Sequence, residues 1–462
     1  MKAWVTYPMK WKWFDSEITC IDTAEGRLTL KGLFIPMFIE QLLMNMMGTV
    51  NTLVLGHYAD EAVAAVGAAN QVMGLIYTFY AVVSGGASIV ISHRLGAGDN
   101  KGAEKTAFSA FIVGTGISIL CSGIMAALAV PVITMLNLEG SVLQMAVGYF
   151  RICVGFSFLQ GIISVLSAVL RSYGHPKEAV TVSLLMNVMN AVLNILIVYR
   201  PIEIPLHGTE GIAIANVISH VIGVGFIAYY FLRSGISHGM WFRDWKALAC
   251  VKEILHVGLP GGIGSLSYAM SQVVSTSILA VLGTIALSTK VYISSVVFYV
   301  SVVGYSLGVS AAILIGWMVG AGEIEKAYRL NRQVLRIAVG VNLILSVLVF
   351  LFYRFLIGLF TDNQAIIEMA QWILFIDIFV EIGRAFNHVE ENSLRGAGDV
   401  IYPMVIAMVS CWMLSILFSY ILGIKCQLGL YGCWIAFMMD ELFRGIMLWR
   451  RFSSKKWIGK KV

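Results

Sequence analysis

The chain has few charged residues. Only 13% of its 462 residues are Asp, Glu, Lys or Arg, whereas 58% are hydrophobic; a soluble protein carries about 25% charged residues. The apolar runs are long and continuous rather than alternating, which excludes an outer-membrane β-barrel. The composition predicts an all-α polytopic membrane protein. The formal charge of +6 is interpreted as a topology signal, so no nucleic-acid partner is expected.

Signatures of catalysis and nucleotide chemistry are also lacking. The seven cysteines have neither metal-site nor disulfide spacing and are interpreted as small buried hydrophobes. No Walker sequence is present, so direct drive by ATP is excluded, and the glycines of GAGD and GAGE are interpreted as turn residues at helix ends. We expect neither an enzyme nor a bound cofactor. The N-terminal segment lacks the continuous apolar core of a signal peptide.

Twelve apolar runs have the length of a membrane span. They fall near 31–56, 63–91, 106–132, 142–168, 178–199, 210–232, 253–283, 292–317, 333–360, 366–392, 401–424 and 428–450. Of the 32 Lys and Arg residues, 26 lie in the N-terminal segment, the even-numbered connections and the tail. The odd-numbered connections hold only Arg200, Lys290, Arg354 and Lys425. Positive charge stays on the cytoplasmic side, so both termini of a multi-pass protein of the cytoplasmic membrane are predicted to be cytoplasmic.

The sequence repeats itself with an offset of 224 residues. Pro36 recurs as Pro260, the GAGD at Gly96 recurs as GAGE at Gly320, and Leu170-Arg171 recurs as Leu394-Arg395. An even number of helices per repeat keeps both halves in one orientation, which predicts two pseudo-symmetric six-helix lobes around a central cavity. The predicted organisation is an N-terminal cytoplasmic segment (1–30), an N-lobe (31–232), a cytoplasmic linker (233–252), a C-lobe (253–450) and a basic cytoplasmic tail (451–462).

The span near 366–392 carries a stripe of ionisable residues. Spacings of four, three, four and three residues place the set within an arc of roughly 80° on one helix face; its members are Asp377, Glu381, Arg384, His388 and Glu391. Such a stripe in a bilayer costs several kcal/mol unless it faces a protein interior or a wet cavity. It is therefore a candidate ion-coupling site. The alternative is a structural ion pair of Glu381 with Arg384 that clamps two helices.

The individual roles in this stripe remain open. Asp377 and Glu381, one turn apart, could chelate Na⁺ or exchange protons. His388 could relay protons or simply occupy a helix end. Asp440 and Glu441 lie within reach of Arg444, and we expect a structural ion network there that also includes Glu391.

Further polar residues lie in other predicted spans. Glu40 shares a helix face with Met44, Met47 and Asn51, a set that could line the substrate cavity. Asn187, Asn190 and Asn194 share another face, where hydrogen bonds between helices or ligand contacts are both open. Pro36 and Pro260 would kink the first helix of each lobe and serve as hinges.

Several motifs together resemble one transporter family. PMFIEQLLMNMMGTVNTLVLGHYADEAVAAVG, the following GAGD, LR-x-x-G and GTEGIAIANVIS, with their counterparts in the second half, are similar to the multidrug and toxic compound extrusion (MATE) family from about residue 31 to 450. The resemblance implies twelve helices in two lobes, and export of amphipathic or cationic small molecules in exchange for Na⁺ or H⁺. It also implies a chain surrounded by membrane lipids, which we expect to be monomeric.

The resemblance transfers unevenly to individual positions. Family members often carry an acid where this chain has Asn51, and an Asn-then-Asp pattern where it has Asn190 and Asn194. An amide cannot exchange a proton near neutral pH, so an N-lobe proton site is in doubt. The C-lobe cation site of the family includes an aspartate that Asp377 matches.

Two transport functions follow from this reading. The first is a cation-coupled antiporter, driven by Na⁺ or H⁺, that exports amphipathic cationic compounds by alternating access. The alternative is a lipid-linked saccharide flippase of the same superfamily, which would need several cationic side chains in its cavity. The deeply placed charges, Glu40, Asp377 and Glu381 against Arg384, favour the first. A channel or a receptor fits the doubled lobes poorly.

Overall fold

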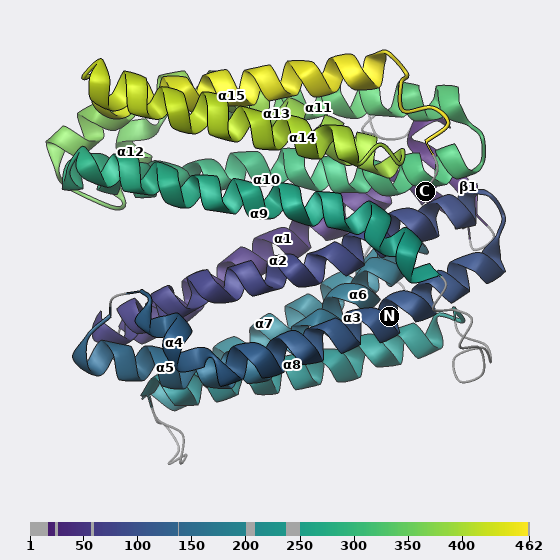
Figure 1. The fold of residues 1–462 in the computed structure, drawn as a ribbon, viewed down its shortest axis with the longest axis horizontal. Helices are drawn as coiled ribbons and strands as arrows, with labels where there is room; N and C mark the ends of the chain where they lie inside the picture. The colour runs from purple at the N-terminus through teal and green to yellow at the C-terminus, as the bar shows by residue number, and fades with distance from the viewer. Residues whose placement is uncertain are drawn as a thin grey trace.

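The computed structural model describes residues 17–23, 26–56, 60–136, 138–199, 208–236 and 250–460, and these are almost entirely helical (Figure 1). Twelve long helical segments follow one another: α1 (Leu30–Gly56), α2 (Asp60–Gly96), α3 (Asn100–Ala127), α5 with α6 (Gly140–Gly155 and Phe158–Ser172), α7 (Pro176–Tyr199), α8 (Gly208–Arg233), α9 (Val251–Val281), α10 (Thr284–Gly320), α11 (Ile324–Leu351), α13 (Gln364–Gly396), α14 with its π-helical continuations η3 and η4 (Ile401–Ser410, Cys411–Ile416 and Ser419–Lys425) and α15 (Gly429–Ser453). The short elements are η1 (Glu17–Thr19), β1 (Cys20–Thr23), β2 (Gly26–Thr29), α4 (Ala129–Thr134) and α12 (Tyr353–Gly358).

Many of these helices suit a membrane. Among the described residues, seven helices, or eight if the bent pair α5–α6 counts as one span, are long and apolar enough to cross a bilayer by length and composition. The long helices α13 and α15 fall outside this group because each carries a series of ionisable residues. The predicted all-α polytopic architecture is confirmed, and α13 and α15 are the helices whose charge needs an explanation.

The helix boundaries repeat along the chain. The limits of α2, α3 and α4 recur 224 residues later as those of α10, α11 and α12. The turn glycines recur as well: Gly98 has φ 76° and Gly322 has φ 78°, a left-handed conformation that glycine adopts without Cβ strain. The two pseudo-symmetric six-helix lobes are thus present. One difference stands out, because α13 is continuous whereas its counterpart bends by 45° between α5 and α6.

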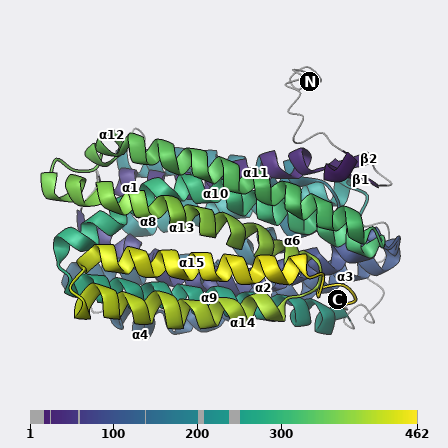
Figure 2. The same ribbon diagram turned by 90° about the horizontal axis from the view of Figure 1, so that it is seen from above.

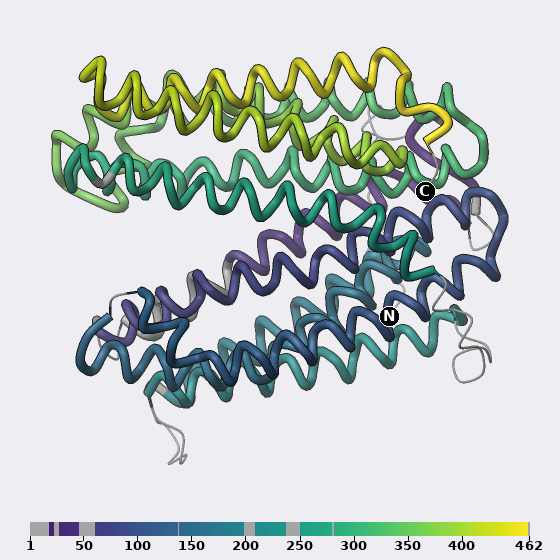
Figure 3. Tube along the Cα trace, viewed as in Figure 1, coloured from purple at the N-terminus to yellow at the C-terminus, as the bar shows by residue number. Residues whose placement is uncertain are grey.

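The two lobes meet along α1, α2, α9 and α10. Helix α2 packs against α9 and α10, and α1 packs against α10, while the other major helix contacts stay within a lobe. The two bundles converge at the end that carries β1 and the C-terminal end of the chain, and diverge toward the opposite end (Figures 1 and 3). The view from above shows α9 and α14 on the face of the C-lobe opposite α11 (Figure 2).

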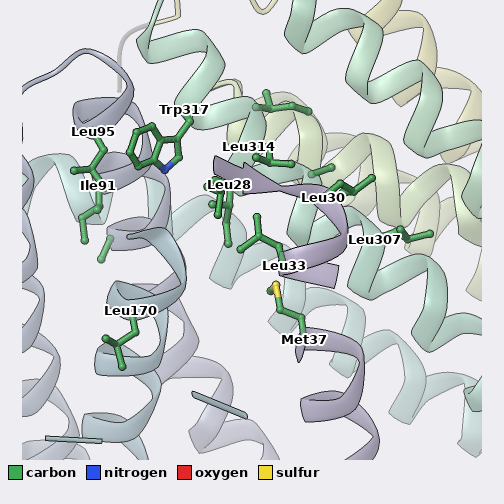
Figure 4. Packing of buried hydrophobic residues seen from close by; sticks show 14 of the residues in the cluster. Leu28, Leu30, Leu33, Met37, Ile91, Leu95, Leu170, Leu307, Leu314 and Trp317 are labelled. Carbon is green, nitrogen blue, oxygen red and sulfur yellow. The ribbon is translucent and has the colours of Figure 1, made fainter. Parts of the chain in front are cut away.

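A hydrophobic cluster closes the converging end. Its members come from both lobes and are nearly or completely buried (Figure 4); they include Leu28, Leu30, Leu33, Met37, Ile91, Leu95, Leu170, Leu307, Leu314 and Trp317. Hydrogen bonds also cross the junction there. The Trp317 indole donates to the backbone oxygen of Ser172 at 2.9 Å, and the His93 Nε2 lies 2.7 Å from the backbone oxygen of Gly396.

The start of the described chain holds an element that the sequence did not predict. β1 and β2 form an antiparallel hairpin in which Cys20 faces Thr29. The Thr29 hydroxyl accepts from the Gly32 amide at 3.0 Å and so caps the start of α1. The hairpin contacts α10, and η1 contacts α11. Residues 1–16 of the predicted N-terminal segment and 237–249 of the predicted linker lie outside the described residues.

Two glycines set the distance between α2 and α10. A Cβ on Gly96 would lie 2.0 Å from the Trp317 backbone oxygen, and one on Gly320 would lie 2.1 Å from the His93 backbone oxygen. We predict that Gly96→Ala and Gly320→Ala each destabilise this conformation by about 1–3 kcal/mol, because backbone cannot yield as a side chain can. Thermal unfolding in detergent measures the effect. Gly116→Ala and Gly340→Ala are matched controls, since each of these glycines faces open space; equal losses at all four positions would contradict the prediction.

Candidate functional site

A cavity of about 490 Å³ lies within the C-lobe. Its walls come from α9, α10, α13, α14, η3 and α15, and the α13 stripe contributes Asp377, Arg384, His388 and Glu391. The fifth member, Glu381, is completely buried beside the cavity and turns toward α11. Four of the five side chains predicted from helical spacing therefore line this cavity.

An ion-pair network joins α13 to α15. Arg384 forms an ion pair with Glu381 on its own helix, and its Nε lies 3.7 Å from Glu441 Oε1 on α15. Arg444 binds the same Glu441 at 3.1 Å and Asp440 at 3.3 Å. Asn387 donates to the Glu441 backbone oxygen at 3.0 Å and also to its carboxylate. The network thus holds Glu441 between two arginines.

Asp377 stands apart from these ion pairs. Its side chain is nearly buried, and its Oδ1 accepts a hydrogen bond from the Trp434 indole at 2.9 Å. In the part of the chain that the structure describes, no cationic side chain lies within ion-pair distance of this carboxylate. With the Glu391–Arg395 pair and Lys290 included, five carboxylates surround this cavity and four cationic side chains face them. One carboxylate is therefore in excess.

Both carboxylate oxygens of Glu381 have a partner. One carboxylate oxygen accepts a hydrogen bond from the Arg384 guanidinium, and the other accepts one from Asn342 Nδ2 of α11 at 3.2 Å. Over the described ranges, no group of three or more His, Cys, Asp or Glu has the arrangement of a metal site.

The C-terminal end of the stripe has different partners from those expected. Glu391 pairs with Arg395 at 2.6 Å. The expected contact between Glu391 and Arg444 is wrong, because Arg444 pairs with Asp440 and Glu441 of its own helix, α15. His388 packs edge-on against the Tyr305 ring, with centroids 5.6 Å apart. It lines the cavity rather than standing at an exposed helix end.

A second cavity of about 610 Å³ lies between the lobes and shares Tyr305 and Arg395 with the first. Glu40 of α1 lines it, and both of its carboxylate oxygens lie 2.9 Å from Nη1 of Arg171. Met44 joins Glu40 in the lining, whereas the side chains of Met47 and Asn51 lie outside the described residues.

The asparagines of α7 divide into two groups. Asn187 lines the interlobe cavity and donates to the Ser183 backbone oxygen at 2.8 Å. Asn190 and Asn194 are completely buried, and Asn194 Nδ2 donates to Asn190 Oδ1 at 3.0 Å. These bonds run within α7. Pro36 and Pro260 lie inside α1 and α9, as the repeat predicts.

Four residues of these sites escaped the sequence analysis. Arg171 and Lys290 were both assigned to connections between spans. Arg171 lies in the last turn of α6. Lys290 lies within α10 and donates to Thr276 Oγ1 at 2.7 Å. Trp434 and Asn342 are neutral residues whose roles depend on tertiary contacts. A signal for Arg171 existed, because its repeat partner Arg395 follows the acid-bearing face of the span near 366–392.

This arrangement defines a class: two repeated helical lobes, with a cavity between them and buried charges in the helices, form a membrane transporter. The MatE family model matches residues 36–196 and 260–421, once in each lobe. The chain therefore belongs to the MATE family.

Individual relatives agree with this assignment. The chain is 34% identical to a protein described as the uncharacterized transporter YisQ of Bacillus subtilis, over 95% of this chain and 96% of that one. It is 26% identical to a probable multidrug resistance protein NorM of Thermotoga maritima, over 98% of both. A solved structure described as the outward-facing conformation of a multidrug resistance MATE family transporter matches its fold with a TM-score of 0.85 and 22% identity, over 92% of this chain and 96% of that one.

The central role of Arg384 can be tested by stability. Arg384→Ala leaves Glu381 buried without its cation and removes one of the two arginines that hold Glu441, so we predict a loss of about 3–5 kcal/mol. Adding Glu381→Gln should restore part of this loss, because a neutral amide needs no counter-charge. Thermal unfolding in detergent of both single variants and the double variant measures the coupling. Strictly additive losses would show that the two side chains do not stabilise one another.

Proposed function

We propose that the chain is a cation-coupled antiporter, driven by Na⁺ or H⁺, that exports amphipathic cationic compounds by alternating access. The observation that carries this proposal is the excess of carboxylates around the C-lobe cavity, with Asp377 outside every described ion pair. A carboxylate that is nearly buried favours occupation by a proton, a metal cation or a cationic ligand over an empty charged state.

In this proposal Asp377 is the residue that exchanges cations. A coupling ion and a cationic substrate would both be drawn to the same uncompensated charge, so binding of one weakens binding of the other. That competition is what antiport requires. Glu381, held by Arg384 and Asn342, positions the network, and His388 and Glu391 flank the route between the two cavities.

The interlobe cavity is proposed as the substrate site. Its wall combines flexible apolar side chains, among them Met44, Met73 and Met186, with polar groups such as Asn187 and the Glu40–Arg171 pair. Methionine adapts to ligands of varied shape. An amphipathic molecule could rest its apolar part there while its charged part approaches the C-lobe acids.

The orientation of the chain is also part of the proposal. The distribution of Lys and Arg places both termini in the cytoplasm. The end where the lobes converge is then the cytoplasmic end, and the conformation described here faces outward. The flanking segment 1–30, the linker 233–252 and the tail 451–462 would all lie on the cytoplasmic side of the cell membrane.

The flippase alternative is less well supported. A lipid-linked pyrophosphate needs cationic side chains that are free to bind it. Around the two cavities Arg171, Arg384, Arg395 and Arg444 each have a carboxylate partner. The other described cationic side chain at these cavities is Lys290, which donates a hydrogen bond to Thr276.

The coupling role of Asp377 is tested in proteoliposomes with imposed Na⁺ and pH gradients applied separately. We predict that Asp377→Asn lowers gradient-driven transport of an amphipathic cation, such as tetraphenylphosphonium, by about tenfold or more while leaving the fold intact. Glu390→Gln is the matched control, because Glu390 is equally buried on α13 but bonds to Asn331 of α11 away from the cavity. Full coupled transport by Asp377→Asn under both gradients would refute the role. Transport of a lipid pyrophosphate but no amphipathic cation would favour the flippase.

A further inference from the structure

A cationic face on α11 lies outside both cavities. Arg329, Arg332 and Arg336 follow one another at spacings of three and four, so they share one face of the helix. All three are exposed. Arg336 stands twelve residues after the first residue of α11, which corresponds to about 18 Å along the helix axis. The face therefore extends well beyond the first turn of the helix.

The duplicated fold does not require this face. The positions 224 residues earlier, on α3, hold Lys105, Phe108 and Ile112. The N-lobe thus has one cation and two apolar residues where the C-lobe has three arginines. Since α3 and α11 have matching boundaries, the arginines are a property of the C-lobe surface and not of the helix packing.

These arginines line a cavity of about 640 Å³ beneath η1. The lining also contains Ile18, Tyr328 and Gln333. Glu325 pairs with Lys455 at 2.8 Å and with Arg329 at 3.5 Å, so Arg329 shares a carboxylate partner. The Arg332 guanidinium lies 5.8 Å from the centre of the Tyr328 ring. Within the described part of the chain, neither Arg332 nor Arg336 forms an ion pair with a carboxylate.

The helix continues the pattern with apolar residues. Beyond Arg336 the same side of α11 presents Gly340, where a Cβ would meet open space, and then the exposed side chains of Leu343 and Ile344. Along α11 two arginines are followed by an apolar strip, and this arrangement is complementary to a phospholipid. The phosphate would lie at the arginines and an acyl chain would lie along the strip.

We propose that Arg332 and Arg336 bind the headgroup of an anionic phospholipid on the membrane surface next to the chain ends. Arginine binds phosphate oxygens through two N–H groups at once, and cationic pockets between transmembrane helices accept anionic headgroups. The ion pair at Arg329 marks the outer boundary of the site. Inorganic phosphate shares the headgroup chemistry but would not use the apolar strip.

The test uses the purified full chain in dodecyl maltoside. Binding of dioleoylphosphatidylglycerol, dioleoylphosphatidylcholine and inorganic phosphate is followed by native mass spectrometry and by thermal unfolding. We expect phosphatidylglycerol to bind about tenfold tighter than phosphatidylcholine and to raise the unfolding temperature, and Arg332→Gln/Arg336→Gln to abolish that difference. Lys101→Gln/Lys105→Gln is the matched control, with the same loss of charge at the same end of the N-lobe; it should retain the wild-type preference.

Three results would overturn the proposal. Equal binding of the two lipids by the wild-type chain would show that the headgroup charge is not recognised. An unchanged preference in Arg332→Gln/Arg336→Gln would place the lipid elsewhere. Stabilisation by inorganic phosphate equal to that by phosphatidylglycerol would show that a free anion, and not a lipid, occupies the cavity. Because the experiment measures binding without transport, its outcome is independent of the antiport proposal.

Discussion

A carboxylate buried in a membrane-spanning helix is costly unless a cation or a proton neutralises it, and α13 carries several. This constraint explains why α13 packs against α15, which supplies Arg444 and brings Glu441 up to Arg384. Removing one partner from such a network costs far more than the network contributes over apolar packing. The network is therefore better understood as a device that holds charges in place than as a source of stability. Among the described residues, Asp377 and Glu390 of α13 have no cationic partner; of the two only Asp377 lines the cavity, which is why we propose it as the residue that exchanges cations.

The repeat separates what the fold needs from what the chemistry needs. The residues 224 positions before Asp377, Glu381, Arg384 and His388 are Cys153, Ser157, Gln160 and Ser164, which carry no charge at neutral pH. Ser157 satisfies its hydroxyl with Tyr80 at 2.7 Å and Ser122 at 2.8 Å. The two lobes thus share helix lengths and turn glycines, while the stripe of ionisable residues on α13 has no counterpart on α5 and α6.

The helices and their two-lobe arrangement could be predicted from sequence, because the features that indicate them are local or periodic. Apolar runs of spanning length, the 224-residue offset and the acidic stripe on α13 all follow from composition and spacing. Arg171 and Lys290 were misplaced because hydropathy assigns a charge near a helix end to a loop, whereas each lies within a helix and has a polar partner. Asn342 and Trp434 had no signal, since a neutral residue becomes part of a charged site only through tertiary packing. The hairpin of β1 and β2 could not be predicted from hydrophobic periodicity, because strands this short show too few alternations to give a signal.

The position of the ion pairs bears on how the lobes could move. Arg171 and Arg395 are repeat counterparts at the interlobe cavity, yet each finds its carboxylate inside its own lobe: Arg171 on α1 and Arg395 one turn back on α13. Glu40 corresponds to Gly264 in the other lobe, and Glu391 corresponds to Ser167. The two acids therefore occupy different positions of the repeat, although each pairs with the arginine of its own lobe. Across the junction, Arg94 binds Glu253 at 2.5 Å, but both side chains are partly exposed, so this pair contributes little. Separating the lobes would therefore break apolar contacts, several hydrogen bonds and a weak ion pair, while the buried ion pairs described here would stay within their lobes. A transporter built in this way could separate its lobes without breaking one of these buried ion pairs.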